Sequence, residues 1–219
     1  MNELTNTLWT ISGSIIFLDC VLIIIAIIAL KNYKKIRGII GEKRAIKTLK
    51  ELPFYKKILN NIYLPNKEKT TEIDILGITQ KGVFVIEYKN HTGKVYGNTK
   101  YKEWVQYYHR KKVKFYSPLR QNYAHICALK EYCPEIPDDK IYSLIVFNDG
   151  CKLKIEGEVK NTLIINHKDL NKQILQVESE NQVYFTQNKV DELYAKLNKL
   201  GNQSKEVKQR HIKSIQSNK

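Results

Sequence analysis

The stretch EIDILGITQKGVFVIEYKN, residues 72–90, decides the fold of this 219-residue chain. It contains two runs rich in β-branched and apolar residues, 72–79 and 83–89, a composition typical of strands. Gln80-Lys81-Gly82 lies between them and is typical of a hairpin turn. The stretch therefore predicts two neighbouring antiparallel strands.

The predicted hairpin brings three charged side chains together. Side chains alternate between the two faces of a strand, so Glu87 and Lys89 share one face with the apolar Val83 and Val85. When the hairpin closes, Asp74 falls across from Glu87. Two carboxylates then lie within side-chain reach of each other, with a lysine beside them.

Such a cluster is typical of metal-assisted hydrolysis of a phosphodiester. Two carboxylates repel each other unless a cation lies between them. Oxygen ligands suit Mg²⁺ or Mn²⁺, so we expect Asp74 and Glu87 to be metal ligands. Lys89 can position a water or stabilise charge that develops on the phosphate. The alternative is a surface ladder of weak ion pairs without catalytic meaning.

A third acid lies on a predicted first helix, residues 33–52. Glu42 stands between Ile39 and Ile46 at helical spacing, so its side chain falls inside the apolar stripe of that helix. A carboxylate directed at the core needs a partner, and a metal site on the adjacent sheet supplies one. The alternative is a position at the margin of the stripe, from which the carboxylate reaches solvent.

The remaining pattern predicts alternating strands and helices. Ser117-Pro118 opens a helix with apolar residues at 119, 123, 126 and 129, and the apolar run 141–147 predicts a buried central strand. Asn188 is the expected N-cap of the last helix. In addition to 72–79 and 83–89, strands are expected at 58–64, 94–96, 103–108, 113–116, 141–147 and 162–165, and helices at 117–132, 169–177 and 189–200.

The net charge of +15 favours anionic partners, either nucleic acid or the anionic inner leaflet of a membrane. The segment 100–120 mixes basic and aromatic residues. Basic side chains bind phosphates, and aromatic rings stack on nucleobases. The alternative is a sheet with its rings inward and its lysines outward. The residues predicted to contact nucleic acid are Lys100, Lys102, Trp104, Arg110, Lys111, Lys112 and Arg120.

The first thirty residues predict a membrane anchor. Residues 9–30 form an apolar run of about 22 residues that Asp19 alone interrupts, which is long enough to cross a hydrocarbon core of roughly 30 Å. A signal peptide would begin with positive charge and end at a cleavage motif, and neither is present. Positive residues follow the run instead. They predict a single-pass protein of the cell membrane, with its N-terminus outside and the rest in the cytoplasm.

A set of ordered motifs resembles a known family, the nuclease-related domain (NERD) of the PD-(D/E)xK nuclease superfamily, over about residues 38–148. The residues that carry the resemblance are Gly41-Glu42, Asn61, Leu64-Pro65, Glu72-Ile-Asp74, Lys81 to Asn90, Gly93, Gly97, Trp104 and Ser117 to His125. Two departures are mild: Glu72 stands where the family usually has Gln, and Ser117 where Asn is more usual.

The resemblance implies an α/β fold, a restriction-endonuclease-like mixed sheet flanked by helices. In this chain, one transmembrane helix, predicted from the apolar run, precedes that fold. The resemblance also implies that Asp74, Glu87 and Lys89 form the catalytic site. Glu42 matches the acid of the first helix, and Gln121 matches the polar residue of the later helix. From its position alone, Gln121 either reaches a phosphate or faces solvent. His125 is expected to be a surface or packing histidine, with a role as a ligand as the alternative.

We therefore expect a membrane-anchored nuclease that depends on Mg²⁺ or Mn²⁺ and on no small-molecule cofactor. The expected division is an anchor (1–31), a nuclease core (32–149), a completing segment (150–200) and a basic disordered tail (201–219). One alternative is a non-catalytic nucleic-acid-binding or scaffold protein with the same fold. Another is a protein whose basic surface docks onto lipid.

Overall fold

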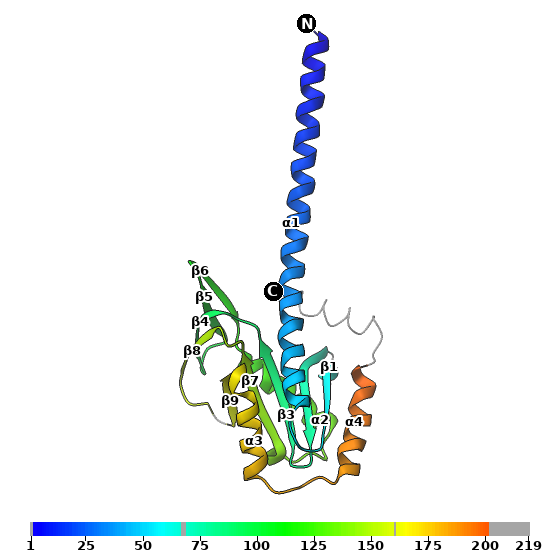
Figure 1. Ribbon diagram of the computed structural model, residues 1–219, viewed down its shortest axis with the longest axis vertical. Helices are drawn as coiled ribbons and strands as arrows, with labels where there is room; N and C mark the ends of the chain where they lie inside the picture. The colour runs from blue at the N-terminus through cyan, green and yellow to red at the C-terminus, as the bar shows by residue number, and fades with distance from the viewer. Residues whose placement is uncertain (1, 67–68, 160, 202–219) are drawn as a thin grey trace. The chain divides into compact units, whose positions relative to one another are not determined.

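The computed structural model describes residues 2–66, 69–159 and 161–201 (Figure 1). Within these ranges, the side chains of residues 2–14, 31, 34, 35, 66 and 69 are not described. The chain divides between Ile40 and Gly41 into two compact units. The predicted tail lies, from residue 202 onward, outside the described residues.

The first unit is the major part of helix α1 (Asn2–Lys50). Eleven large apolar side chains between Ile15 and Leu30 are each 49–72% exposed. Among the residues with described side chains, no helix is both long enough and apolar enough to cross a membrane. The anchor predicted from sequence begins at Trp9, whose side chain lies outside the described set, and it stays a prediction.

The second unit is a mixed α/β domain, which confirms the predicted α/β class. It contains two sheets where the sequence predicted one mixed sheet. In chain order its strands are β1 (Lys56–Asn66), β2 (Lys69–Thr79), β3 (Val83–Lys89), β4 (Gly93–Asn98), β5 (Glu103–Tyr108), β6 (Lys111–Tyr116), β7 (Ile141–Phe147), β8 (Cys151–Glu156) and β9 (Thr162–Asn166). The helices that follow α1 are α2 (Pro118–Tyr132), α3 (Leu170–Glu180) and α4 (Gln187–Gly201), with short 3-10 turns at Asp138–Lys140 and His167–Asp169.

The larger sheet has the order β1-β2-β3-β7-β9 and is built on the predicted hairpin. β1, β2 and β3 pair antiparallel, whereas β3, β7 and β9 pair parallel. The smaller sheet has the order β6-β5-β4-β8, in which only β4 and β8 are parallel. β7 is a buried central strand, as its continuous apolar run predicted.

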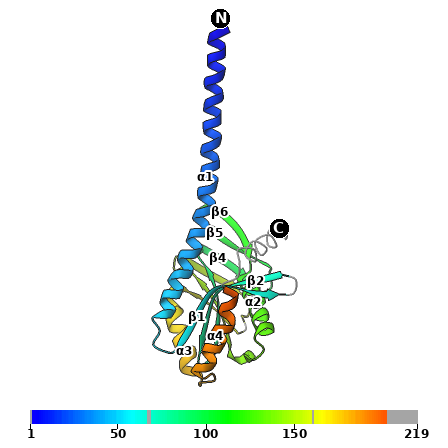
Figure 2. The ribbon, with the colours of Figure 1, turned by 90° about the vertical axis from the view of Figure 1, so that its right-hand side faces the viewer.

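Helices cover both faces of the larger sheet (Figures 1 and 2). On one face, Leu129 of α2 and Leu193 and Leu197 of α4 pack against Val83 and Val85. On the other face, Ala45 and Leu49 of α1 and Ile174 of α3 pack against Phe84 and Ile86. The side chains of β3 therefore alternate between two separate cores. Glu87 and Lys89 lie on the same face as Val83 and Val85, which α2 covers.

The smaller sheet has its own core on its inner face. Trp104 is fully buried there with Val95, and its ring stacks at 6.4 Å on Phe147 of β7. Gly97 leaves room for this ring, because a Cβ atom at residue 97 would lie 2.6 Å from it. The prediction that Trp104 contacts nucleic acid is wrong, since a ring enclosed in the core cannot stack on a base.

α4 and α2 each differ from the sequence prediction in a detail that matters for the site or the helix start. α4 begins at Gln187, and the hydroxyl of Thr186 accepts a hydrogen bond from the Lys189 backbone at 3.2 Å, so Thr186 caps the helix in place of Asn188. In α2, Tyr123 is 69% exposed, whereas Asn122 and His125 are buried. The buried face of α2 is therefore partly polar, and its polar residues lie next to β3.

Candidate active site

Asp74 lies where the regular pairing of β2 is interrupted on both sides. The β1–β2 register passes from Asn60↔Ile75 to Ile62↔Ile73, and Asn61, opposite Asp74, has a φ of +52° that asparagine tolerates. The β2–β3 ladder likewise ends at Ile75↔Ile86. Beyond it, Asp74 Oδ2 accepts a hydrogen bond of 3.0 Å from the backbone N–H of Tyr88. This bond fixes Asp74 beside Glu87, as the hairpin predicted.

Lys89 links the buried Glu87 to helix α2. Lys89 Nζ lies 2.6 Å from Glu87 Oε1 and donates to Gln121 Oε1 at 2.9 Å. The Glu87 side chain is 1% exposed and that of Lys89 is 20% exposed. Gln121 therefore does not simply face solvent: it holds the lysine amine in place. Its predicted contact with a phosphate stays a prediction.

His125 is a site residue that the sequence analysis missed. Its Nε2 lies 3.0 Å from Glu87 Oε2, and its Nδ1 lies 2.6 Å from Thr71 Oγ1. A neutral ring satisfies both contacts when Nε2 donates to the carboxylate and Nδ1 accepts from the hydroxyl. The available signal was its spacing, because residues four apart on a helix share a face and Gln121 is four residues earlier.

Asn122, which lies in the sequence between Gln121 and His125, attaches α2 to the larger sheet. Its buried side-chain amide donates to the Val85 carbonyl at 3.1 Å and to Ser143 Oγ at 2.8 Å. Val85 belongs to β3 and Ser143 to β7, so one side chain ties the helix to both strands. This attachment positions Gln121 and His125 against Glu87 and Lys89.

The charges of this cluster do not balance. Burial raises the pKa of Asp74 well above its ordinary value, and repulsion from Glu87 adds to the effect. Burial alone would raise the pKa of Glu87, but Lys89 and His125 lower it below its ordinary value. Burial would lower the pKa of Lys89, but Glu87 and Asp74 raise it, so the amine stays charged. One lysine therefore faces two acids.

Two further acids surround the cluster. Glu42 of α1 is partly buried, and its pKa is raised first by burial and then by repulsion from Glu72 and Glu87. Its place near the site agrees with the sequence prediction. Glu72, which stands where the family usually has Gln, accepts a hydrogen bond of 2.6 Å from Tyr63 Oη. Glu42, Asp74 and Glu87 therefore all act on the charge of Lys89, and Glu72 lies beside Glu42.

The donor set fits a divalent cation held in part by its substrate. Among the described residues, no three His, Cys, Asp or Glu side chains are grouped to hold a metal. Mg²⁺ is commonly bound by one or two carboxylates, with water and substrate phosphates as the other ligands. Asp74 and Glu87 provide such a pair. Within the described part of the chain, Asp74 Oδ1 has no hydrogen-bond partner, and the side chain keeps an opening to solvent.

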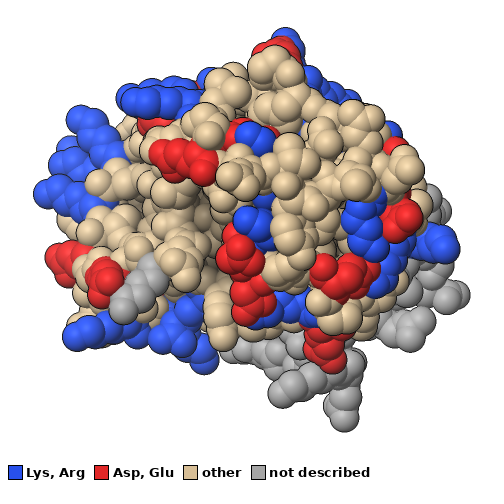
Figure 3. Space-filling view, turned by 90° about the horizontal axis from the view of Figure 1, so that it is seen from below, with Lys and Arg blue, Asp and Glu red and all other residues tan. Residues whose placement is uncertain are grey.

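The basic residues predicted to contact nucleic acid lie around the smaller sheet. Lys100, Lys102, Arg110, Lys111, Lys112 and Arg120 are all exposed. Arg120 donates to the Lys100 carbonyl at 3.1 Å, which joins the start of α2 to the β4–β5 turn. These residues stay predicted contacts. On the face shown in Figure 3, basic and acidic side chains are interspersed.

Comparisons with known proteins agree with this geometry. Residues 37–148 match the model of the nuclease-related domain, NERD, and they include Glu42, Asp74, Glu87, Lys89 and Gln121. An uncharacterized protein of Bacillus anthracis is 31% identical over 204 residues, which cover 91% of this chain and 93% of the relative.

One solved structure is also similar, the small subunit of the heterodimeric restriction endonuclease R.BspD6I. It is 15% identical, the match covers 81% of this chain and 88% of that one, and the TM-score is 0.33.

The excess of carboxylates predicts that Asp74→Asn stabilises the protein when divalent cations are absent. The asparagine keeps an oxygen that accepts from Tyr88 N–H and removes a buried charge. Since one pKa unit corresponds to about 1.4 kcal/mol, the free energy of unfolding at pH 7 should rise by on the order of 1 kcal/mol or more. Urea unfolding of the full chain in detergent with chelator measures it.

The pH dependence provides a second check of the same variant. A raised pKa in the folded state means that wild-type stability falls as pH rises from about 4 through that raised value. Asp74→Asn should lack this decline. Asp138→Asn is the control, since Asp138 forms an exposed pair with Lys130 that contributes about 0–1 kcal/mol. A lower free energy of unfolding in Asp74→Asn than in the wild type would contradict the claim that the charge of Asp74 opposes folding.

Proposed function

Since this chain belongs to the nuclease-related domain family, NERD, we propose that it is a nuclease that hydrolyses phosphodiester bonds of DNA or RNA with a divalent cation, Mg²⁺ or Mn²⁺. The observation that carries the proposal is the cluster of Asp74, Glu87 and Lys89, in which two acids share one lysine. A cation and a phosphate would together complete this cluster.

Asp74 and Glu87 would hold the cation. When bound, it would polarise the phosphate and lower the pKa of a water molecule. Asp74 is already oriented by the Tyr88 N–H, and Glu87 by His125. Because these hydrogen bonds exist before substrate arrives, the carboxylates need little reorganisation when the cation and the phosphate bind.

Lys89 stabilises negative charge and orients water in this proposal. Its raised pKa keeps the amine protonated at neutral pH, so it donates hydrogen bonds and does not act as a general base. Glu87 and Gln121 restrict the amine to one position beside Asp74. Glu42 either supports the cation or adds to the field that orients Lys89. Gln121 would contact the phosphate through its amide.

We also propose that the N-terminal helix anchors the chain in a membrane. The chain would be a single-pass protein of the cell membrane, with its N-terminus outside and the nuclease domain in the cytoplasm. The support is the apolar run 9–30, the exposed apolar side chains between Ile15 and Leu30, and the positive residues Lys31, Lys34, Lys35 and Arg37 that follow. A large exposed apolar surface indicates contact with lipid or with another protein.

Cleavage assays test the catalytic proposal. Full-length chain in detergent is incubated with labelled single- and double-stranded DNA and RNA, in Mg²⁺, in Mn²⁺ or in chelator. We expect metal-dependent cleavage that falls at least about 100-fold in Glu87→Gln and in Lys89→Met, because a group that stabilises transition-state charge is commonly worth that much.

Glu131→Gln and Lys172→Met are matched controls for these variants, since both side chains are exposed and neither belongs to the cluster. Each should cleave within about twofold of wild type. Absence of cleavage with every substrate and metal, while nucleic-acid binding persists, would leave the non-catalytic binding protein as the correct account. Cleavage that survives both site substitutions would place the active site elsewhere.

Carbonate extraction of membranes tests the anchor. The wild-type chain should remain in the pellet, whereas Ile23→Asp/Ile27→Asp should move to the supernatant, since each charge in a membrane helix costs about 2.5–3.5 kcal/mol. Ile36→Asp, outside the apolar run, should behave as wild type. Release of the wild type by carbonate would rule out a spanning helix.

A further inference from the structure

The outer face of the smaller sheet carries lysines and tyrosines in two adjacent rows. The strand register places Lys152, Lys94, Tyr107 and Lys112 side by side across β8, β4, β5 and β6. The next row contains Lys154, Tyr96, Val105 and Lys114. These eight residues point away from the core that contains Trp104, because side chains alternate along each strand.

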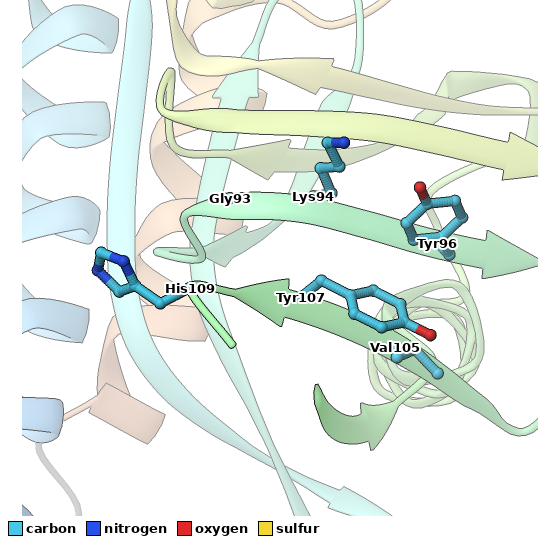
Figure 4. A pocket seen from close by; sticks show the side chains of 6 residues that line it. All are labelled: Gly93, Lys94, Tyr96, Val105, Tyr107 and His109. Atoms are coloured by element: carbon cyan, nitrogen blue, oxygen red, sulfur yellow. The ribbon is translucent and has the colours of Figure 1, made fainter. Parts of the chain in front are cut away.

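The two tyrosine rings form the floor of a groove on this face. Tyr96 and Tyr107 are 37% and 41% exposed, and their rings meet edge to face with centroids 5.4 Å apart. The groove has a volume of about 750 Å³, and Gly93, Lys94, Val105 and His109 complete its lining (Figure 4). Figure 4 shows the two rings on the neighbouring strands β4 and β5.

A lysine lies over each ring. Lys154 Nζ lies 5.6 Å from the centroid of Tyr96, and Lys112 Nζ lies 5.9 Å from that of Tyr107. Cations are thus held beside exposed aromatic faces in two places. The folded core does not require these rings, since Trp104 and Phe115 fill the inner face.

The two rows carry positive charge only. The two rows contain five lysines and no acid, and of these lysines Lys114 is paired with Glu103 at 3.3 Å. Acids occur further along the strands, at Glu156, which lies opposite Asn98, and at Glu103, the first residue of β5. The face shown in Figure 3 mixes both signs, so the groove differs in kind from that part of the surface.

We propose that this groove binds a single-stranded segment of nucleic acid, which makes single-stranded or locally unpaired nucleic acid the substrate class of the nuclease. Rings at the floor stack on bases, and the surrounding lysines bind phosphates. In a duplex the faces of the bases are stacked on one another, so the exposed tyrosine rings cannot stack on them. The inference rests on the proposed function, because it assigns the substrate of that site.

The chain leads directly from the catalytic strand into a strand that lines the groove. Lys89 ends β3 and Gly93 begins β4, with three residues between them. Five residues of extended chain span at most about 18 Å, which limits the separation between the Cα atoms of Lys89 and Lys94. A strand that lies on the two tyrosines is therefore within a few nucleotides of Lys89.

Binding assays in chelator test the groove without any cleavage. The full-length chain in detergent is titrated into a fluorescent 20-nucleotide single strand and, separately, a 20-base-pair duplex. Since stacking on one ring is worth about 1–3 kcal/mol per base, Tyr96→Ala/Tyr107→Ala should weaken single-strand binding at least about 30-fold. Tyr96→Phe/Tyr107→Phe keeps the rings and should bind as wild type.

The lysines have a separate readout. Lys94→Ala/Lys112→Ala/Lys154→Ala should reduce the slope of log affinity against log salt by about 2, since each phosphate contact contributes about 0.7 for a single strand. Tyr123→Ala and Lys172→Ala are exposed controls on α2 and α3 and should change neither quantity. The retention of binding by the phenylalanine variant separates loss of stacking from misfolding.

Four outcomes decide the proposal. Loss in the alanine variant with retention in the phenylalanine variant supports it, even if the wild type never cleaves, in which case only the nuclease proposal fails. Single-strand binding unchanged by the alanine variant overturns the groove, even if the chain cleaves. Tighter binding of the duplex than of the single strand overturns it as well. So does binding to anionic lipid vesicles in the absence of nucleic-acid binding.

Discussion

The repulsion between Asp74 and Glu87 is the constraint on which the site depends. The partly buried Asp74 and the buried Glu87, on adjacent strands, share the single charge of Lys89, while Glu42 lies close by with Glu72 beside it. Such an excess of negative charge opposes folding unless a cation joins it. The protein keeps the cluster nevertheless and surrounds it with hydrogen bonds that fix each side chain, which is the arrangement expected of a site prepared for a metal and a phosphate.

The fold holds the cluster through polar contacts between elements that lie far apart in the sequence. α2 is attached to β3 and β7 by Asn122, and from that attachment Gln121 and His125 reach Lys89 and Glu87. The irregular backbone at Asn61 interrupts the β1–β2 ladder opposite Asp74. The regular sheet thus supplies rigidity, and the irregular position at Asn61 lies where Asp74 leaves the regular ladder.

The hairpin and its three charged residues could be predicted from sequence because a strand and a turn are local patterns. β3, β5 and β7 have the predicted bounds, since each is a short run with an apolar or aromatic composition. β8 was missed because three of its six residues are charged, and its strand conformation depends on pairing with β4. Trp104 and His125 were misjudged for a related reason: the sequence shows the residue type, whereas burial depends on which face another element covers.

Manganese binding followed by electron paramagnetic resonance tests the central claim most directly. Mn²⁺ is titrated into the full-length chain in detergent, and the signal of the free ion reports how much is bound. The account predicts that the wild type binds Mn²⁺ and that Asp74→Asn and Glu87→Gln each weaken the affinity at least about tenfold, because a carboxylate ligand is lost. Equal affinity in the wild type and both variants, or no binding by the wild type, would contradict it.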